Sequence, residues 1–161
     1  MNSSIEQPIT LHYPAELRDG WPRPLADQWL ARYPQIFDAD DLRQTIKQPR
    51  AHFGEWFAAV HLYETEGALS LVEKYCYRNH RRKVQVLDSF LSAEDCTFLR
   101  NLRATHGVQP PDLFVYIPDT ERFWFAEVKG TDRLSALQRK SHTAIAQTLG
   151  VPVRMFYVRP A

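Results

Sequence analysis

The 161-residue sequence lacks the features of a membrane or exported protein. No stretch is long enough and apolar enough to span a bilayer. The start, MNSSIEQPIT, contains neither the basic segment nor the apolar segment of a signal peptide. There is also no internal repeat and no low-complexity tract. With 44% apolar and 24% charged residues, the composition is that of one soluble globular domain. We therefore expect a cytoplasmic protein with no membrane partner.

Cysteine is scarce, which argues against a disulfide framework or a zinc module. Cys76 and Cys96 form no Cys-x-x-Cys pair, and two such residues suit reduced thiols in a core. A zinc site made from Cys76, His80, Cys96 and His106 is disfavoured, because their spacing matches no common zinc pattern. The net charge of +1 neither requires nor excludes a nucleic-acid partner, so the local distribution of charge has to decide.

Residues 1–50 differ from the rest of the chain because they contain six prolines. Proline fixes φ and removes a backbone donor, so long regular elements are not expected there. The pattern predicts short helices at Leu25–Arg32 and Ala39–Lys47, the second with two aspartates in its first turn. We interpret residues 1–50 as a helical and irregular extension that packs on a domain formed by residues 51–161.

The middle of the chain reads as mainly helical. From His52 to about Glu64, apolar residues recur at steps of three and four, which predicts an amphipathic helix. Residues 68–77 fit either a helix or a strand, with a slight preference for a strand. Ser92 to Asp95 resembles a capping box that opens a helix ending near Thr105, with Gly107 just beyond it.

The C-terminal third indicates strands around one long helix. Asp112–Ile117 and Arg122–Lys129 are predicted to be strands of a hairpin that turns through residues 118–121. A helix over Leu134–Leu149 and a last strand over Val151–Val158 follow. This order predicts an α/β or α+β domain with a mixed sheet.

The predicted hairpin carries the residues with chemical potential. Side chains alternate along a strand, so Glu127 and Lys129 point to the same face, and Asp112 begins the partner strand near the level of Glu127. Two carboxylates held together repel each other unless a cation lies between them. Oxygen ligands of this kind suit Mg²⁺ or Mn²⁺, and a nearby lysine can orient the attacking water. The alternatives are an exposed Glu–Lys pair and an aspartate that caps a turn.

These residues resemble a known nuclease motif. Pro111-Asp112, followed by Glu127-Val-Lys129, is similar to the signature of PD-(D/E)xK nucleases. More narrowly, residues 125–138, FAEVKGTDRLSALQ, resemble the VRR-NUC family, whose pattern continues with a glycine, an Asp-x-Leu-Ser turn and a helical glutamine. The resemblance covers residues 110–158 well and extends less specifically to Phe53, but it does not concern residues 1–50.

The resemblance implies a restriction-endonuclease-like α/β core, with a mixed β-sheet flanked by helices, and a metal-dependent active site. Asp112 and Glu127 would bind the metal, with the carbonyl of Val128 as a third oxygen ligand. Lys129 would orient or help deprotonate the nucleophilic water, and Gln138 would position Lys129 or the phosphate. For Gln138, an exposed polar residue on a helix is an equally good interpretation.

The family also has a glutamate on the first core helix, where it binds the metal or a metal-bound water. Glu55 is our match, and Glu73 is its competitor. Glu55 would also be explained as an acidic residue that favours the first turn of a helix.

Basic residues on both sides of the motif predict a surface that contacts DNA phosphates. Each of them alone would suit an ordinary solvated surface, but their grouping favours the functional interpretation. No zinc finger or recognition helix is present, so we expect recognition of DNA shape rather than of base sequence. The predicted contact residues are Arg78, Arg81, Arg82, Lys83, Arg133, Arg139 and Lys140.

The sequence therefore predicts a Mg²⁺- or Mn²⁺-dependent nuclease that cuts branched, flapped or junction DNA. Three alternatives stay open: a non-catalytic nucleic-acid-binding module with the same fold, a nuclease toxin domain, and a partner-binding domain that docks through residues 1–50. Analogy with small stand-alone nucleases also suggests a homodimer.

Overall fold

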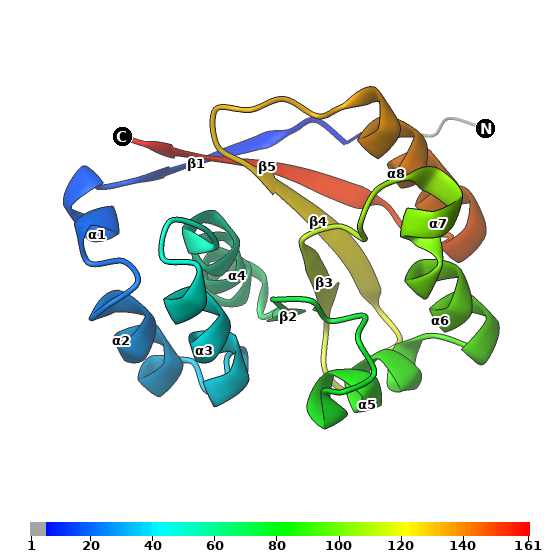
Figure 1. The fold of residues 1–161 in the computed structure, drawn as a ribbon, viewed down its shortest axis with the longest axis horizontal. Helices are drawn as coiled ribbons and strands as arrows, with labels where there is room; N and C mark the ends of the chain where they lie inside the picture. The colour runs from blue at the N-terminus through cyan, green and yellow to red at the C-terminus, as the bar shows by residue number, and fades with distance from the viewer. Residues whose placement is uncertain (1–5) are drawn as a thin grey trace.

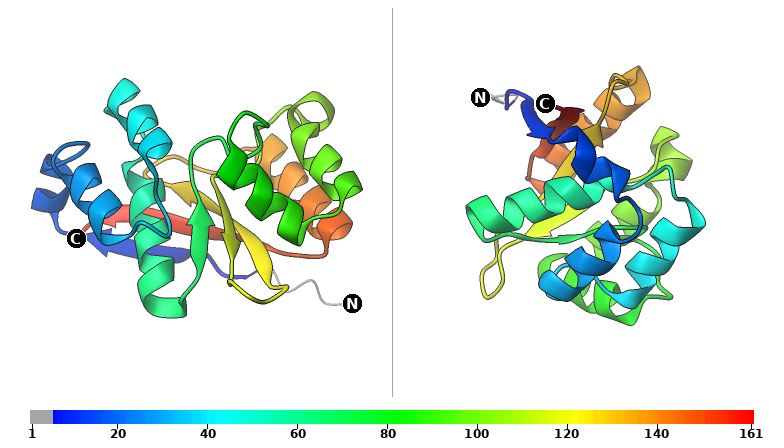
Figure 2. Two further views of the ribbon diagram at one scale, coloured as in Figure 1. Left: turned by 90° about the horizontal axis from the view of Figure 1, so that it is seen from below. Right: turned by 90° about the vertical axis from the view of Figure 1, so that its left-hand side faces the viewer.

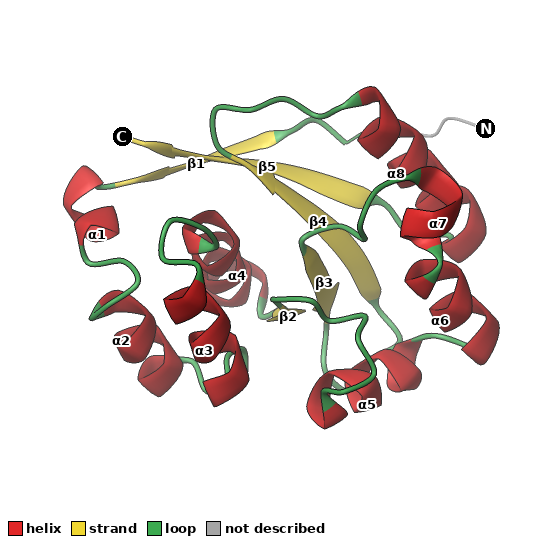
Figure 3. Ribbon diagram, in the orientation of Figure 1, coloured by secondary structure: helices red, strands yellow, loops and turns green. Residues whose placement is uncertain are grey.

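A computed structural model describes residues 6–161 and contains one mixed five-stranded sheet with helices on both sides (Figures 1 and 3). The strands lie in the order β1 (Ile9–Tyr13), β5 (Val153–Pro160), β4 (Phe123–Lys129), β3 (Leu113–Tyr116) and β2 (Leu69–Leu71). β1 and β4 run parallel to β5, whereas β3 is antiparallel to both β4 and β2. The predicted α/β class with a mixed sheet flanked by helices is confirmed.

Two groups of helices lie to either side of the sheet (Figure 2). The first group contains α1 (Ala15–Asp19), α2 (Leu25–Arg32), α3 (Ala39–Lys47) and α4 (Phe53–Glu66). The second contains α5 (Arg81–Phe90), α6 (Ala93–Arg100), α7 (Leu102–His106) and α8 (Ala136–Leu149). Within residues 6–161, no helix has the length and apolar character needed to cross a membrane.

The central strands are buried on both faces, which explains their nearly continuous apolar sequence. Leu113 and Ala126 belong to the core that contains the buried residues of α2 and α4. Phe114 and Phe125, one position along each strand, belong to the core formed with α5–α8. The two strands are therefore fixed from both sides, and the side chains at their ends are held in register.

The N-terminal segment contributes more regular structure to the fold than its proline content led us to expect. The helices at Leu25–Arg32 and Ala39–Lys47 have their predicted bounds, but the segment also forms α1 and the edge strand β1. The ring of Phe37 stacks on Trp56 of α4, with 3.8 Å between their centroids. The segment thus shares the sheet and the core with the rest of the chain.

The structure differs from the expectation most clearly between β2 and β3. Only Leu69–Leu71 of the ambiguous stretch is a strand, because Glu73 and Lys74 adopt left-handed backbone conformations that end it. α5 begins with the basic residues Arg81, Arg82 and Lys83, and this part of the chain was not predicted to be helical. The helix expected up to Thr105 is interrupted at Asn101, although Ser92 caps its start by accepting the N–H of Asp95.

Candidate active site

Asp112 and Glu127 lie opposite each other at the ends of neighbouring strands. The register pairs Leu113 with Ala126, so the next positions along the two strands are Asp112 and Glu127. Asp112 accepts a hydrogen bond of 2.8 Å from the N–H of Val128, which fixes the carboxylate against β4. Glu127 is buried, with 5% of its surface exposed. The structure thus brings together the two carboxylates that the predicted hairpin aligned.

Lys129 and Gln138 both contact the carboxylate of Glu127. The Lys129 Nζ lies 3.6 Å from the Glu127 Oε1 and 3.3 Å from an oxygen of Asp132. The Gln138 Nε2 donates to the Glu127 Oε1 at 3.0 Å. The expectation that Gln138 positions Lys129 or a phosphate stays a prediction, and the structure adds a hydrogen bond from its amide to Glu127.

The position of Gln138 follows from the cap of α8. Its side-chain oxygen accepts the N–H of Ser135, and the Ser135 hydroxyl accepts the N–H of Gln138. This reciprocal pair is a capping box, which satisfies two donors at the start of the helix. Because the cap holds the side-chain oxygen of Gln138, it turns the side-chain nitrogen toward Glu127. The first turn of α8 therefore supports the site.

Glu55 reaches the same site from the first turn of α4. A hollow of about 390 Å³ is lined by Glu55, Asp112, Glu127, Lys129 and Gln138, among other residues. Gly54 lets the helix approach the sheet closely, since a Cβ at this position would lie 3.3 Å from the side chain of Val128. The two interpretations of Glu55 are therefore compatible, because it both lies in the first turn of the helix and lines the hollow.

Four carboxylates line the hollow, against one lysine, Lys129, and two arginines, Arg18 and Arg50. Burial raises the pKa of Asp112 well above its usual range, and the nearby Glu127 and Glu55 raise it further. Burial also raises the pKa of Glu55. Burial alone would lower the pKa of Lys129, but the carboxylates of Glu127 and Asp132 raise it overall. A divalent cation would offset this excess of carboxylate charge.

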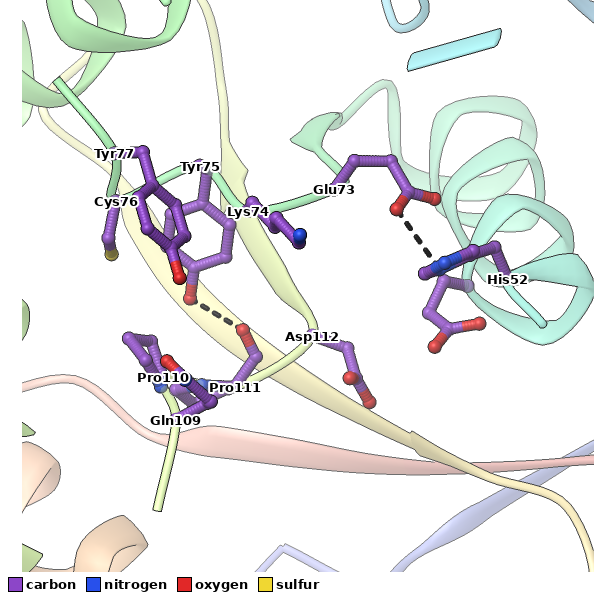
Figure 4. A pocket seen from close by; sticks show the side chains of 11 residues that line it. His52, Glu73, Lys74, Tyr75, Cys76, Tyr77, Gln109, Pro110, Pro111 and Asp112 are labelled. Atoms are coloured by element: carbon purple, nitrogen blue, oxygen red, sulfur yellow. Dashed lines mark hydrogen bonds and ion pairs between the residues drawn. The ribbon is translucent and has the colours of Figure 1, made fainter. Parts of the chain in front are cut away.

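Beside the hollow, His52 and Glu73 form a contact that the sequence did not indicate. The His52 Nδ1 lies 3.0 Å from Glu73, and the Trp56 indole donates to the other oxygen of Glu73 at 3.1 Å. Figure 4 shows the Glu73 carboxylate turned toward His52. Since both oxygens of Glu73 are engaged, Glu55 is the better candidate for the glutamate that reaches a metal.

Two arginines from the N-terminal segment also line the hollow, and neither was predicted. Arg18 and Arg50 are exposed at its edge. The Arg18 guanidinium donates to the Tyr13 hydroxyl at 3.1 Å and lies over the ring of Phe53. Their position depends on the fold of residues outside the motif, so the motif carries no signal for them.

The prediction that Lys83 contacts DNA is wrong. Only 2% of its surface is exposed, and its Nζ donates to Asp41 at 2.6 Å. It also donates to the carbonyls of Val72 and Glu73. Lys83 is therefore a buried structural ion, because the start of α5 packs against α3.

Arg82 is also occupied within the protein, at 2.8 Å from Asp38 and 3.3 Å from Asp41. This pairing argues against its predicted role at DNA phosphates. The other basic residues of the predicted surface are exposed, namely Arg78, Arg81, Arg133, Arg139 and Lys140.

A separate group, Asp38, Asp40 and His80, has ligand atoms within 4.8 Å of one another and could hold a metal ion. It was not predicted. Its acidic charge is already balanced, because Arg82 pairs with Asp38 and Arg43 pairs with Asp40. The His80 Nδ1 accepts the N–H of Lys83, so a neutral His80 carries its proton on Nε2, the atom that faces the aspartates. An ion-pair network explains this group.

Comparisons of the sequence with models of known protein families and with curated proteins found no match. The resemblance to VRR-NUC nucleases therefore depends on the motif residues and on the geometry in which they meet.

Proposed function

We propose that the protein is a divalent-metal-dependent nuclease of the PD-(D/E)xK type that resembles the VRR-NUC family. The observation that carries this proposal is the meeting of Asp112 and Glu127 on neighbouring strands, with Lys129 at 3.6 Å from Glu127, in one hollow. A mixed sheet flanked by helices is compatible with the restriction-endonuclease-like core that the resemblance implies.

In this proposal the metal is held by the carboxylates of Asp112 and Glu127 and by the carbonyl of Val128. Hard oxygen donors of this kind suit Mg²⁺ or Mn²⁺. Such an ion, when bound, neutralises charge on the phosphate and lowers the pKa of a water molecule. Glu55, Asp112 and Glu127 do not form a set with ligand atoms within 4.8 Å of one another among the described residues, so this arrangement does not place all three on one ion. By the resemblance, Glu55 would bind the metal or a metal-bound water.

The remaining residues orient the reacting groups. Lys129 lies beside Glu127 and would donate to the attacking water or to a phosphate oxygen. Gln138 holds one oxygen of Glu127 and leaves the other to a ligand. His142 also lies near, with its Nε2 at 3.8 Å from that second oxygen. A fixed carboxylate needs little rearrangement when the metal and substrate bind, which favours catalysis.

The proposed substrate is DNA, recognised by its shape. The four exposed arginines and Lys140 named above, together with Arg18 and Arg50 at the hollow, would contact phosphates without reading bases. Homodimer formation remains a prediction that follows from the resemblance.

A cleavage assay tests the proposal. Linear duplex, single-stranded, flapped and four-way-junction DNA would each be incubated with Mg²⁺, Mn²⁺ or EDTA. We expect metal-dependent cutting that Lys129→Ala and Glu127→Gln reduce by about 100-fold or more. Lys47→Ala removes an exposed lysine that lines none of the hollows described here and should cut normally. Cutting in EDTA, or equal cutting by Lys129→Ala, would contradict the proposal. If the protein bound DNA but cut none of the forms, the non-catalytic module would replace it.

A further inference from the structure

A second hollow, of about 230 Å³, adjoins the candidate active site (Figure 4). It shares His52, Glu55 and Asp112 with the first hollow, so the two meet at the carboxylates. Its other walls are formed by the segments 73–77 and 109–111, of which only Glu73 and Pro111 entered the comparison with the nuclease motif. A molecule bound here would touch Asp112 directly.

Tyr77 gives this hollow an exposed aromatic wall. Half of its surface, 51%, is accessible, whereas most large apolar side chains of the protein are buried. Ile9, Ile46 and Leu137 are the other large apolar side chains exposed within residues 6–161, and none of them lines this hollow. An exposed ring beside a polar site offers a flat face on which another ring can stack.

The backbone that carries Tyr77 is held firmly in an unusual conformation. Glu73 and Lys74 have φ angles of 53° and 51°, and His52, across the hollow, has a φ of 71°. Lys83 binds the carbonyls of Val72 and Glu73, and the Tyr75 hydroxyl donates to the Pro111 carbonyl at 2.6 Å. Left-handed non-glycine residues persist only where the surrounding contacts impose them, and they concentrate at functional sites.

We propose that this second hollow binds one unpaired nucleotide of a DNA strand, with its base stacked on Tyr77 and its phosphate beside Lys74. The inference rests on the proposed function for the choice of DNA. It makes the preferred substrate a strand with an unpaired nucleotide next to the bond that is cut.

Three properties of the hollow favour this ligand over a duplex. Its volume lies below the roughly 300–1,000 Å³ of sites for drug-sized ligands, so it suits a single planar ring system. Stacking needs an unpaired base, because a paired base presents only its edges in the grooves. Lys74 is exposed, and Gln109 offers an amide donor and acceptor to the edge of the base.

A binding experiment with matched variants tests the inference separately from catalysis. Anisotropy of a labelled single strand of about 12 nucleotides, and of the duplex of the same sequence, would be measured in Ca²⁺, and the DNA would then be checked for cutting. Tyr77→Ala should weaken single-strand binding about 5- to 150-fold, the range expected for one stacked base. Tyr77→Phe keeps the ring and should bind as the wild type does. Ile46→Ala, which removes a similarly exposed apolar side chain on α3, should also bind normally.

Duplex binding should be the same in all four proteins. Unchanged single-strand binding by Tyr77→Ala would overturn the inference, and so would an equal loss for the duplex or the same loss in Tyr77→Phe. Because Tyr77 is half exposed, we expect its substitution to leave the melting temperature unchanged. Equal melting temperatures would show that the fold of the variants is intact.

Cleavage separates this inference from the proposed function. If Tyr77 governs single-strand binding but no DNA form is cut, the inference stands and the nuclease proposal fails. If single strands are cut with the same KM by the wild type and Tyr77→Ala, the nuclease proposal stands and the inference fails.

Discussion

At the scale of single residues, Asp112 shows how a candidate active site opposes stability. Its carboxylate is buried beside Glu127 and Glu55, and these effects on its pKa outweigh the Val128 N–H and Lys129, which favour its charged form. The folded protein therefore holds the proton of Asp112 more tightly than the unfolded chain does. The stabilisation by this group is full below its ordinary pKa of 3.8 and is lost as the pH rises through the higher folded-state pKa.

We expect Asp112→Asn to raise the melting temperature of the metal-free protein at pH 8. Asparagine removes the buried charge but still accepts the Val128 N–H. A gain of about 1 kcal/mol corresponds to about 2–4 °C for a chain of this size. Melting in EDTA at pH 4.5 and pH 8 would show a larger gain at pH 8. Excess Mg²⁺ should close the gap by stabilising only the wild type. A lower melting temperature of the variant at pH 8 in EDTA would contradict this account.

Lys83 shows the opposite balance, because its charge is needed by the core. Its partner Asp41 is fully buried, and burial raises the pKa of Asp41 to about 6 even though Lys83 lowers it. We expect Lys83→Met to destabilise the protein by about 3–5 kcal/mol, because Asp41 would be left without its ammonium partner. Urea unfolding would measure this change. Arg81→Met removes an exposed charge two residues before Lys83 on the same helix. It should change the free energy of unfolding by less than about 0.5 kcal/mol. Similar losses in both variants would refute the structural role of Lys83.

At the scale of elements, the first turn of α8 combines a helix cap with a hydrogen bond to Glu127. Ser135→Ala removes the hydroxyl that accepts the Gln138 N–H and should cost about 1 kcal/mol of stability. Gln138→Ala loses its part of the same cap and also releases Glu127. We therefore expect similar melting temperatures for the two variants, but a drop in kcat of about 10-fold or more only for Gln138→Ala. Equal kcat values for Ser135→Ala and Gln138→Ala would contradict a role of Gln138 in the candidate site.

The elements that could be predicted from the sequence are those determined by local signals. α2 and α3 have their expected bounds because capping residues and proline punctuation act within a few residues. β1 was missed because its five residues, Ile9–Tyr13, become a strand only by pairing with β5 at the other end of the chain. The strand favoured over residues 68–77 stops early because tertiary contacts hold Glu73 and Lys74 in left-handed conformations.

The candidate site divides in the same way. Asp112 and Glu127 could be brought together from the sequence because one tight hairpin connects them. Arg18 and Tyr77 could not, because they reach the site through the packing of α1 and of the segment after β2. Lys83 was misassigned for the same reason, since a run of basic letters does not reveal which side chain meets a buried aspartate.

At the scale of the whole molecule, residues 6–50 form part of the hydrophobic core and are not an addition to its surface. β1 covers an edge of β5, and Ile36 and Phe37 are fully buried, the latter against Trp56. Each such side chain contributes about 1.5–3 kcal/mol by burial, which is a large part of the 5–15 kcal/mol that usually separates folded from unfolded domains.

We therefore expect a chain that begins at residue 51 to lose cooperative folding. It would expose the edge of β5 and one face of Trp56, and Lys83 would lose Asp41, so aggregation should accompany the loss. Thermal melting followed by circular dichroism, together with light scattering, would measure both effects. A chain that begins at residue 6 keeps every element described here and serves as the control. If the chain from residue 51 melted cooperatively and stayed monodisperse, the motif-bearing part would be a domain by itself, and the arginines of the N-terminal segment would be accessories to a site that forms without them.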